Sequence, residues 1–152
     1  MSRLFLALGA INAFVCVLMG AIGAHILKQK FSSDLYNTFQ TGLQYHFYHA
    51  LGLILIGTLL FHLPQSKLVK LSGWVMLTGI LFFSGTLYII SFTEMRTLGM
   101  VAPIGGVSLM SAWLMLAYAI WFKKWIKYCS NDVICWFKMD DLIFFASCPR
   151  GL

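Results

Sequence analysis

Charged residues are scarce in this chain of 152 residues: only 11% are Asp, Glu, Lys or Arg, and only five are acidic. Soluble domains carry about 25% charged residues. Hydrophobic residues make up 60% of the chain, whereas a soluble domain of this size buries only about two-thirds of the surface of its unfolded chain. The composition therefore excludes an ordinary soluble domain and favours a membrane protein, with the lipid bilayer as its partner.

The sequence also lacks the residue patterns of catalysis and of nucleic-acid binding. It shows no nucleophile placed with a general base, no carboxylates paired for acid–base work and no glycine-rich phosphate loop. The 11 basic residues lie singly or in pairs between apolar runs and form no basic face or recognition motif. We therefore expect a protein that is not an enzyme and binds no nucleic acid.

Cysteine occurs four times, but not in a zinc-binding pattern. Cys129, Cys135 and Cys148 follow the spacing C-x5-C-x12-C, which is not a usual spacing of zinc ligands. Cys16 lies inside an apolar run, where a thiol serves as a small packing residue. We expect four reduced thiols and no resident metal or other cofactor.

Four uncharged runs are each long enough to cross a membrane. Crossing about 30 Å of hydrocarbon takes about 20 apolar residues, and in lipid the backbone must satisfy its hydrogen bonds within the segment. Because the runs are continuous and not alternating, they indicate helices and not strands of a barrel. The sequence thus predicts an all-α membrane protein, a four-helix bundle with short loops. Its spans are expected at about 4–27, 44–61, 71–92 and 100–122, in a domain of residues 1–127.

The first loop and the tail have patterns of their own. Ser32 or Ser33 is expected to cap a separate interfacial helix with Asp34 in its first turn. In the tail, residues 128–152, the apolar stretch at 142–146 is too short to span a membrane, and we assign the tail no function.

The Lys and Arg residues of the short loops predict the orientation. With four spans, six basic residues lie on the side of the two termini and three on the other: Arg3, Lys67, Lys70, Lys123, Lys124 and Lys127, against Lys28, Lys30 and Arg96. Both termini are therefore expected in the cytoplasm. A cleaved signal peptide is the alternative for the first run, but about 20 apolar residues exceed the usual 7–15, so we expect a retained span.

Small residues predict where the helices contact one another, because helices in lipid associate through close packing and hydrogen bonds. Gly105 and Gly106 follow Pro103, and a second interpretation is a loosened helix start that exposes backbone groups to a ligand. The expected packing residues are Gly20, Gly23, Ala24, Gly42, Gly85, Gly105 and Gly106.

Histidines and glutamines form the candidate polar cluster. His25 closes the first predicted span, while His46 and His49 share one face at the start of the second. In the four-span topology these ends lie on the same side of the membrane. Asn12 lies deep in the first span. The members of the cluster are His25, Gln40, Gln44, His46 and His49.

Several roles are open for this cluster. The first is a structural cluster in which each bond between helices contributes about 1 kcal/mol. The second is a metal site, and the third is a haem ligand pair of His25 with His46 or His49. The fourth is a pH-sensitive gate. Ion-coupled carriers usually hold ionisable residues inside the membrane, and these spans have none beyond the histidines. We expect a packing or interaction module, with a small transporter or channel-like oligomer and a metal- or haem-binding electron carrier as alternatives.

Four motifs, in order, resemble those of the YgdD-like family of small inner-membrane proteins of unknown function. They are GAIGAH at 20–25, QTGLQY at 40–45 with HAL at 49–51, FSGTLY at 83–88 and PIGGVS at 103–108. The resemblance covers about residues 3–124 and implies a four-helix, multi-pass protein of the bacterial inner (plasma) membrane, alone or with a homo-oligomeric or other membrane partner. It implies no established activity, and the tail from residue 128 departs from the family pattern.

Overall fold

The computed structural model describes residues 1–122, 135–139 and 142–146. The chain divides into two units, Met1–Ala119 and Ile120–Leu152. In the second unit, β1 (Cys135–Met139) and β2 (Leu142–Ala146) form an antiparallel pair in which Phe137 pairs with Phe144. The sequence did not predict this pair. Cys129, Cys148 and the basic residues Lys123, Lys124 and Lys127 lie outside the described residues.

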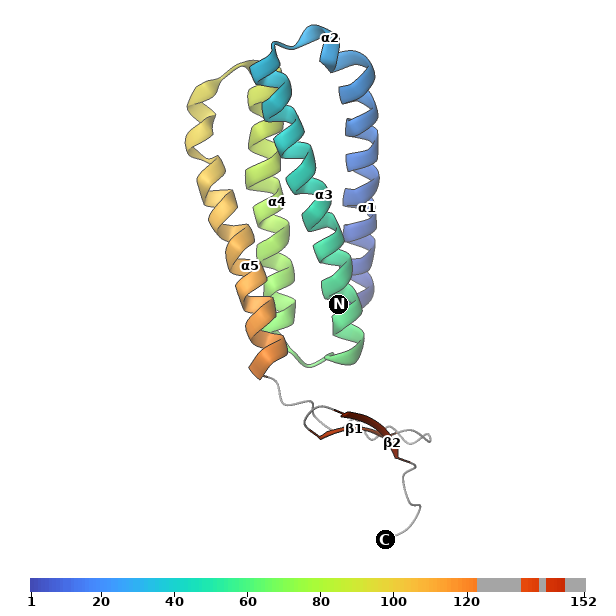
Figure 1. The fold of residues 1–152 in the computed structure, drawn as a ribbon. Helices are drawn as coiled ribbons and strands as arrows, with labels where there is room; N and C mark the ends of the chain where they lie inside the picture. The colour runs from blue at the N-terminus through green and yellow to red at the C-terminus, as the bar shows by residue number, and fades with distance from the viewer. Residues whose placement is uncertain (123–134, 140–141, 147–152) are drawn as a thin grey trace. The chain divides into compact units, whose positions relative to one another are not determined.

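The first unit consists of long helices that run antiparallel to one another in chain order (Figure 1). They are α1 (Ser2–Ile22), extended by the π-helix η1 (Gly23–Leu27) and by α2 (Lys28–Lys30), then α3 (Ser33–His62), α4 (Lys67–Thr93), the 3-10 helix η2 (Arg96–Met100) and α5 (Ala102–Phe122). Four of these segments are long and apolar enough to cross a membrane. The predicted four-helix membrane bundle is thus confirmed, while its orientation and the span limits within lipid stay predictions.

α3 begins earlier than the sequence predicted. Ser32 caps it by accepting a hydrogen bond from the Leu35 amide at 3.5 Å, and Asp34 lies in the first turn. The separate interfacial helix expected in the first loop is therefore the beginning of α3 itself. Polar residues such as Gln40 and Gln44 lower the local hydropathy but do not interrupt the helix.

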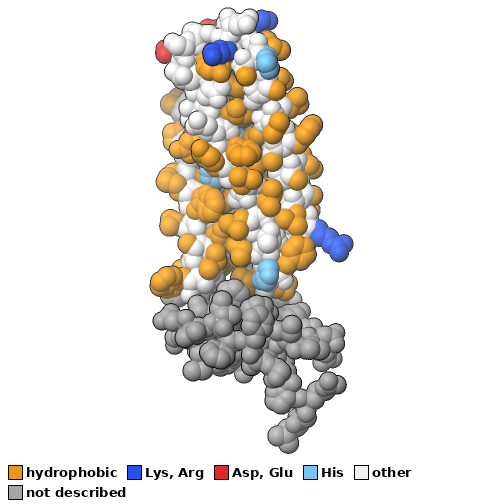
Figure 2. Space-filling model, turned by 45° about the vertical axis from the view of Figure 1, so that its right-hand side comes forward, with side chains coloured by type: hydrophobic (Ala, Val, Ile, Leu, Met, Phe, Trp, Pro, Cys, Tyr) orange, Lys and Arg blue, Asp and Glu red, His pale blue; other side chains and the backbone are white. Residues whose placement is uncertain are grey.

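Charged side chains lie only toward the ends of the bundle. No Asp, Glu, Lys or Arg occurs within 4–27, 35–66, 71–93 or 97–122. Figure 2 shows hydrophobic side chains along the length of one face, with the basic and acidic side chains near the ends. This distribution fits a body that is surrounded by acyl chains and ends at two polar interfaces.

The interior is apolar on both sides of its middle. The half near the α3–α4 connection holds an aliphatic core to which all four long helices contribute: Phe5, Leu53, Ile56, Leu60, Val69, Met76, Ile80, Leu109, Ala112, Leu116 and Ala119. In the other half, Phe39 packs on Tyr88 with ring centroids 5.4 Å apart, and Phe31 packs on Phe92 at 5.6 Å.

Glycines bring the helix backbones into direct contact. A Cβ on Gly9 of α1 would lie 2.9 Å from the Ala50 carbonyl oxygen of α3, and a Cβ on Gly105 of α5 would lie 2.8 Å from the Phe82 carbonyl carbon of α4. Real Cβ atoms do not approach backbone so closely, so only glycine fits at either position. Gly85 of α4 is different, since nothing lies within 4 Å of where its Cβ would be.

We predict that Gly105→Ala destabilises the bundle by about 1–3 kcal/mol, because the added methyl group forces α5 away from α4. Gly85→Ala is the matched control on the facing helix and should be neutral or slightly stabilising, since it adds helix propensity without a clash. Free energies of unfolding in mixed lipid–SDS micelles measure both. Equal free energies for the two variants would contradict the contact.

Candidate functional site

A histidine joins three helices in the interior of the bundle. His46 of α3 is 6% exposed. Its Nε2 lies 2.9 Å from Oδ1 of Asn12 on α1, and its Nδ1 lies 3.2 Å from the hydroxyl oxygen of Tyr88 on α4. Both ring nitrogens therefore have partners, each on a different neighbouring helix.

The geometry gives this hydrogen-bond chain a direction. The Asn12 amide nitrogen Nδ2 donates to the Leu8 carbonyl at 2.7 Å, which leaves the amide oxygen facing His46. An amide oxygen can only accept, so Nε2 of His46 must carry the proton, and Nδ1 then accepts from the Tyr88 hydroxyl. The chain runs from Tyr88 through a neutral His46 and Asn12 to the Leu8 carbonyl, and every member is satisfied.

The sequence placed His46 and His49 at the start of a span near the membrane interface. The helix that carries them begins earlier than predicted, while their depth in lipid stays a prediction. α3 runs from Ser33 to His62, so at 1.5 Å per residue His46 lies about 20 Å from either end. The chain of Asn12, His46 and Tyr88 is thus in the middle of the bundle.

His49 lies one turn further along α3 and has different surroundings. Its Nδ1 lies 2.6 Å from the Tyr45 carbonyl oxygen of the same helix, so Nδ1 carries the proton. The imidazole stacks on the Tyr45 ring, with centroids 6.0 Å apart and planes 16° apart, and lies 6.3 Å from the Trp113 ring of α5.

The other three predicted members do not join the histidines. Gln40 donates from Nε2 to the Tyr36 hydroxyl at 2.8 Å, Gln44 is exposed, and His25 is exposed in η1. Within residues 1–122, no hydrogen bond links these three to His46 or His49. The expected convergence of five residues therefore needs correction, because His25 follows Asn12 by about 20 Å of helix.

Sequence reasoning missed two of the three members of the chain. Asn12 stood out as a polar residue deep in an uncharged run, but it was not connected to a histidine. Tyr88 lay at the end of an FSGTLY motif without an assigned role. The available signal was the rule that a polar side chain in the middle of a span needs a partner on a neighbouring helix.

The predicted packing residues fall into two groups. Gly23, Gly42 and Gly105 lie at close contacts: a Cβ on Gly23 would be 2.6 Å from Cε1 of Phe39, and one on Gly42 would be 3.1 Å from Cβ of Leu87. Gly20 and Gly106 have ordinary spacing, Gly85 faces open space and Ala24 is exposed. Close contacts also occur at Gly9, Gly52, Gly57, Gly73 and Gly79.

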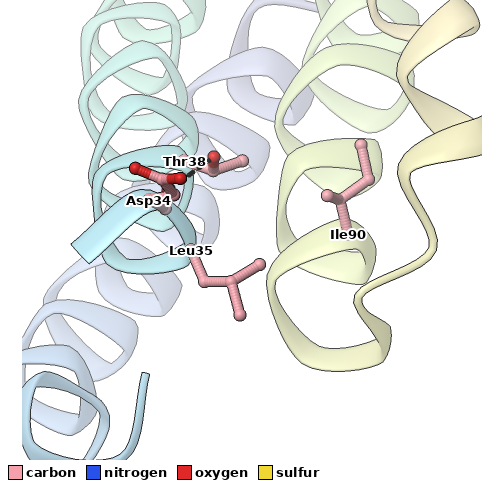
Figure 3. Close-up of a pocket in the computed structure, with 4 residues that line it drawn as sticks. All are labelled: Asp34, Leu35, Thr38 and Ile90. Atoms are coloured by element: carbon pink, nitrogen blue, oxygen red, sulfur yellow. Dashed lines mark hydrogen bonds between the residues drawn. The ribbon is translucent and has the colours of Figure 1, made fainter. Parts of the chain in front are cut away.

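An open pocket of about 290 Å³ lies between the first turns of α3 and the end of α4 (Figure 3). Asp34, Leu35, Thr38 and Ile90 line it, and the Thr38 hydroxyl donates to the Asp34 carbonyl at 2.9 Å. Among these four residues is one carboxylate and no histidine. In the described part of the chain, no three His, Cys, Asp or Glu side chains are grouped as metal ligands.

Known proteins similar to this chain are membrane proteins without an assigned role. A family model described as "Protein of unknown function (DUF423)" matches residues 19–106, which include His46 and Tyr88. The UPF0382 membrane protein YwdK of Bacillus subtilis (strain 168) is 44% identical over 117 residues, which cover 77% of this chain and 95% of the relative. A UPF0382 membrane protein of Staphylococcus epidermidis (strain ATCC 12228) is 42% identical over 117 residues, covering 77% and 94%. No solved structure matches.

Removing the hydroxyl of Tyr88 tests the chain. In Tyr88→Phe, Nδ1 of His46 loses its donor in a place that water does not reach, and we predict a loss of about 1 kcal/mol in the free energy of unfolding. Tyr48→Phe is the matched control, since Tyr48 lies on the same helix as His46 and is 58% exposed. Unfolding in lipid–SDS mixtures measures both variants. Indistinguishable free energies of unfolding would argue against the hydrogen-bond chain through His46.

Proposed function

Since this chain belongs to the DUF423 family of membrane proteins of unknown function, we propose that it is a non-enzymatic packing and interaction module of the bacterial plasma membrane. In this role the four helices form a fixed scaffold, and an outer face of the scaffold binds another membrane helix. The observation that carries the proposal is the hydrogen-bond chain through His46, which commits the interior polar groups to holding α1, α3 and α4 together.

The state of His46 favours packing over the alternatives. A metal or haem iron bound at His46 would have to displace Asn12 or Tyr88, since Nε2 is bonded to Asn12 and Nδ1 to Tyr88. Transport through the bundle would have to pass the apolar core on one side of this hydrogen-bond chain and the buried Phe39 ring, which packs on Tyr88, on the other. Either role would require the interior to be rearranged, whereas packing uses the interior as it stands.

A regular stripe of residues on α1 supports an external partner helix. Positions that alternate in steps of three and four residues all point away from the bundle: Ala7, Ala10, Phe14, Val17, Ala21 and Ala24. Steps of three and four are the spacing at which two helices pack along a common seam, and small residues let helices approach closely in lipid. Ala24, predicted from the sequence as a packing residue, continues this α1 stripe into η1.

The partner is another copy of this chain or a different membrane protein, and the same stripe serves either. The Lys and Arg distribution supports an orientation with both termini in the cytoplasm. In this orientation the ends that carry η1 and η2 face the other side of the membrane.

A photoreactive amino acid in place of Phe14, at the centre of the α1 stripe, tests the proposal in living cells. We expect a crosslink to a protein of defined mass. Ala10→Phe together with Ala21→Phe should reduce the yield about tenfold or more, since overpacking a helix contact costs about 1–3 kcal/mol.

The matched control is Ile11→Phe with Leu18→Phe, which adds the same rings at exposed positions beside the stripe. Ile11 and Leu18 are 58% and 50% exposed, so this pair should leave the yield unchanged. Adducts with lipid alone, or equal losses from both pairs of substitutions, would refute the α1 stripe as an interface.

A further inference from the structure

Four rings from three helices form an aromatic patch at mid-height of the bundle. Tyr45 and His49 come from α3, Phe83 from α4 and Trp113 from α5. Besides the stacking of His49 on Tyr45, the Tyr45 and Phe83 rings lie 4.8 Å apart, and His49 lies 6.3 Å from Trp113. Tyr45 is 43% and Trp113 40% exposed. At this height the exposed faces of these rings meet acyl chains and not water.

The patch surrounds a hydrogen-bond acceptor that the protein does not use. Because Nδ1 of His49 donates to the Tyr45 carbonyl, Nε2 carries a lone pair, and within residues 1–122 no hydrogen bond reaches it. Among the described side chains, the only fully enclosed nitrogen or oxygen without a partner is Oγ of Ser84. Nε2 of His49 is therefore not fully enclosed, although the residue is only 6% exposed.

His49, with its unpaired acceptor, differs from the other two histidines of α3. His46 has partners at both nitrogens, and the exposed His62 lies at the end of the helix, where water completes its bonds. His49 lies about 20 Å from either end of α3, and hydrocarbon supplies no donor. In the predicted span, a solute dissolved in the membrane can supply the donor for Nε2.

We propose that His49 and the aromatic patch bind a membrane-soluble quinol, whose hydroxyl donates to Nε2 of His49 while its ring packs on Tyr45 and Trp113. The exposed aromatic faces suit a flat apolar ring, and the lone pair of Nε2 selects a hydroxyl donor. The uncharged spans on every side exclude an ionic ligand, since a charge in hydrocarbon is costly. This inference does not depend on the α1 stripe.

The tautomer of His49 gives the site a preference between the two redox forms. A quinol presents an O–H donor, whereas the corresponding quinone presents only acceptors. Since Nε2 accepts and has no proton to give, the reduced form makes a hydrogen bond at Nε2 that the oxidised form cannot make there. Loss of one neutral hydrogen bond in an apolar site corresponds to about a tenfold difference in affinity.

The test uses the full chain in lipid nanodiscs and a short-chain ubiquinol kept reduced under anaerobic conditions. Calorimetric titration compares the quinol with its quinone, with its dimethyl ether and with an aliphatic isoprenoid alcohol. We expect the quinol to bind about tenfold more tightly than the quinone and the ether, and the alcohol to bind more weakly than the quinol because it has no ring to stack.

Two variants and a matched control connect the result to the patch. His49→Phe keeps a ring but removes Nε2, so the quinol should bind as weakly as the quinone, whose affinity stays unchanged. Trp113→Leu should weaken both forms by the same factor. His62→Phe is the control, because Nδ1 of His62 makes the same kind of contact with its own helix, 3.3 Å from the Thr58 carbonyl, and it should change neither affinity.

Equal binding of quinol and quinone to the wild-type chain would overturn the proposal, as would the absence of saturable binding or tighter binding of the aliphatic alcohol. Full selectivity retained in His49→Phe would also overturn it. Should His49→Phe fail to fold, the comparison of the two redox forms on the wild-type chain and on Trp113→Leu decides the question.

Discussion

Hydrocarbon offers no hydrogen-bond partner, so each polar group inside a membrane bundle must find its partner within the protein. In this chain several of these bonds also join the helices, although Oγ of Ser84 is enclosed without a partner. His46 links α1 to α4, the Ser91 hydroxyl donates to the Leu35 carbonyl at 3.3 Å, and the Ser108 hydroxyl donates to the Val75 carbonyl at 3.0 Å. Because hydrocarbon offers no partner, a few polar side chains bond between helices and determine which helices are neighbours.

Close backbone contacts lie about one helical turn from the hydrogen bonds between helices, since Gly9 and Ala50 are three and four residues from Asn12 and His46. Gly9 and Gly105 allow α1 and α5 to approach their neighbours more closely than any side chain would permit, and dispersion along those contacts replaces the hydrophobic effect, which lipid does not supply. The links through His46 then fix the register of helices that could otherwise slide. A scaffold built in this way leaves its outer faces free, which is why the α1 stripe and the aromatic patch are where binding is proposed.

The sequence predicted the helices better than it predicted the site. Long uncharged runs are sufficient evidence for spanning helices, whereas the start of α3 at Ser33 was obscured by polar residues in its first turns. The chain of Asn12, His46 and Tyr88 depends on the relative register of three helices. A single sequence shows each polar residue but not its height against a neighbouring helix, so the histidines were paired with nearby polar residues instead.

The directed hydrogen-bond chain is the centre of this account, and the protonation of its middle member tests it most directly. Nitrogen-15 NMR of the chain in bilayers at neutral pH, with His46 assigned by comparison with a His46→Gln variant, reports which ring nitrogen carries hydrogen. The account predicts a neutral ring with the proton on Nε2 and an unprotonated, hydrogen-bonded Nδ1. A proton on Nδ1 in place of Nε2, or on both nitrogens, would contradict it.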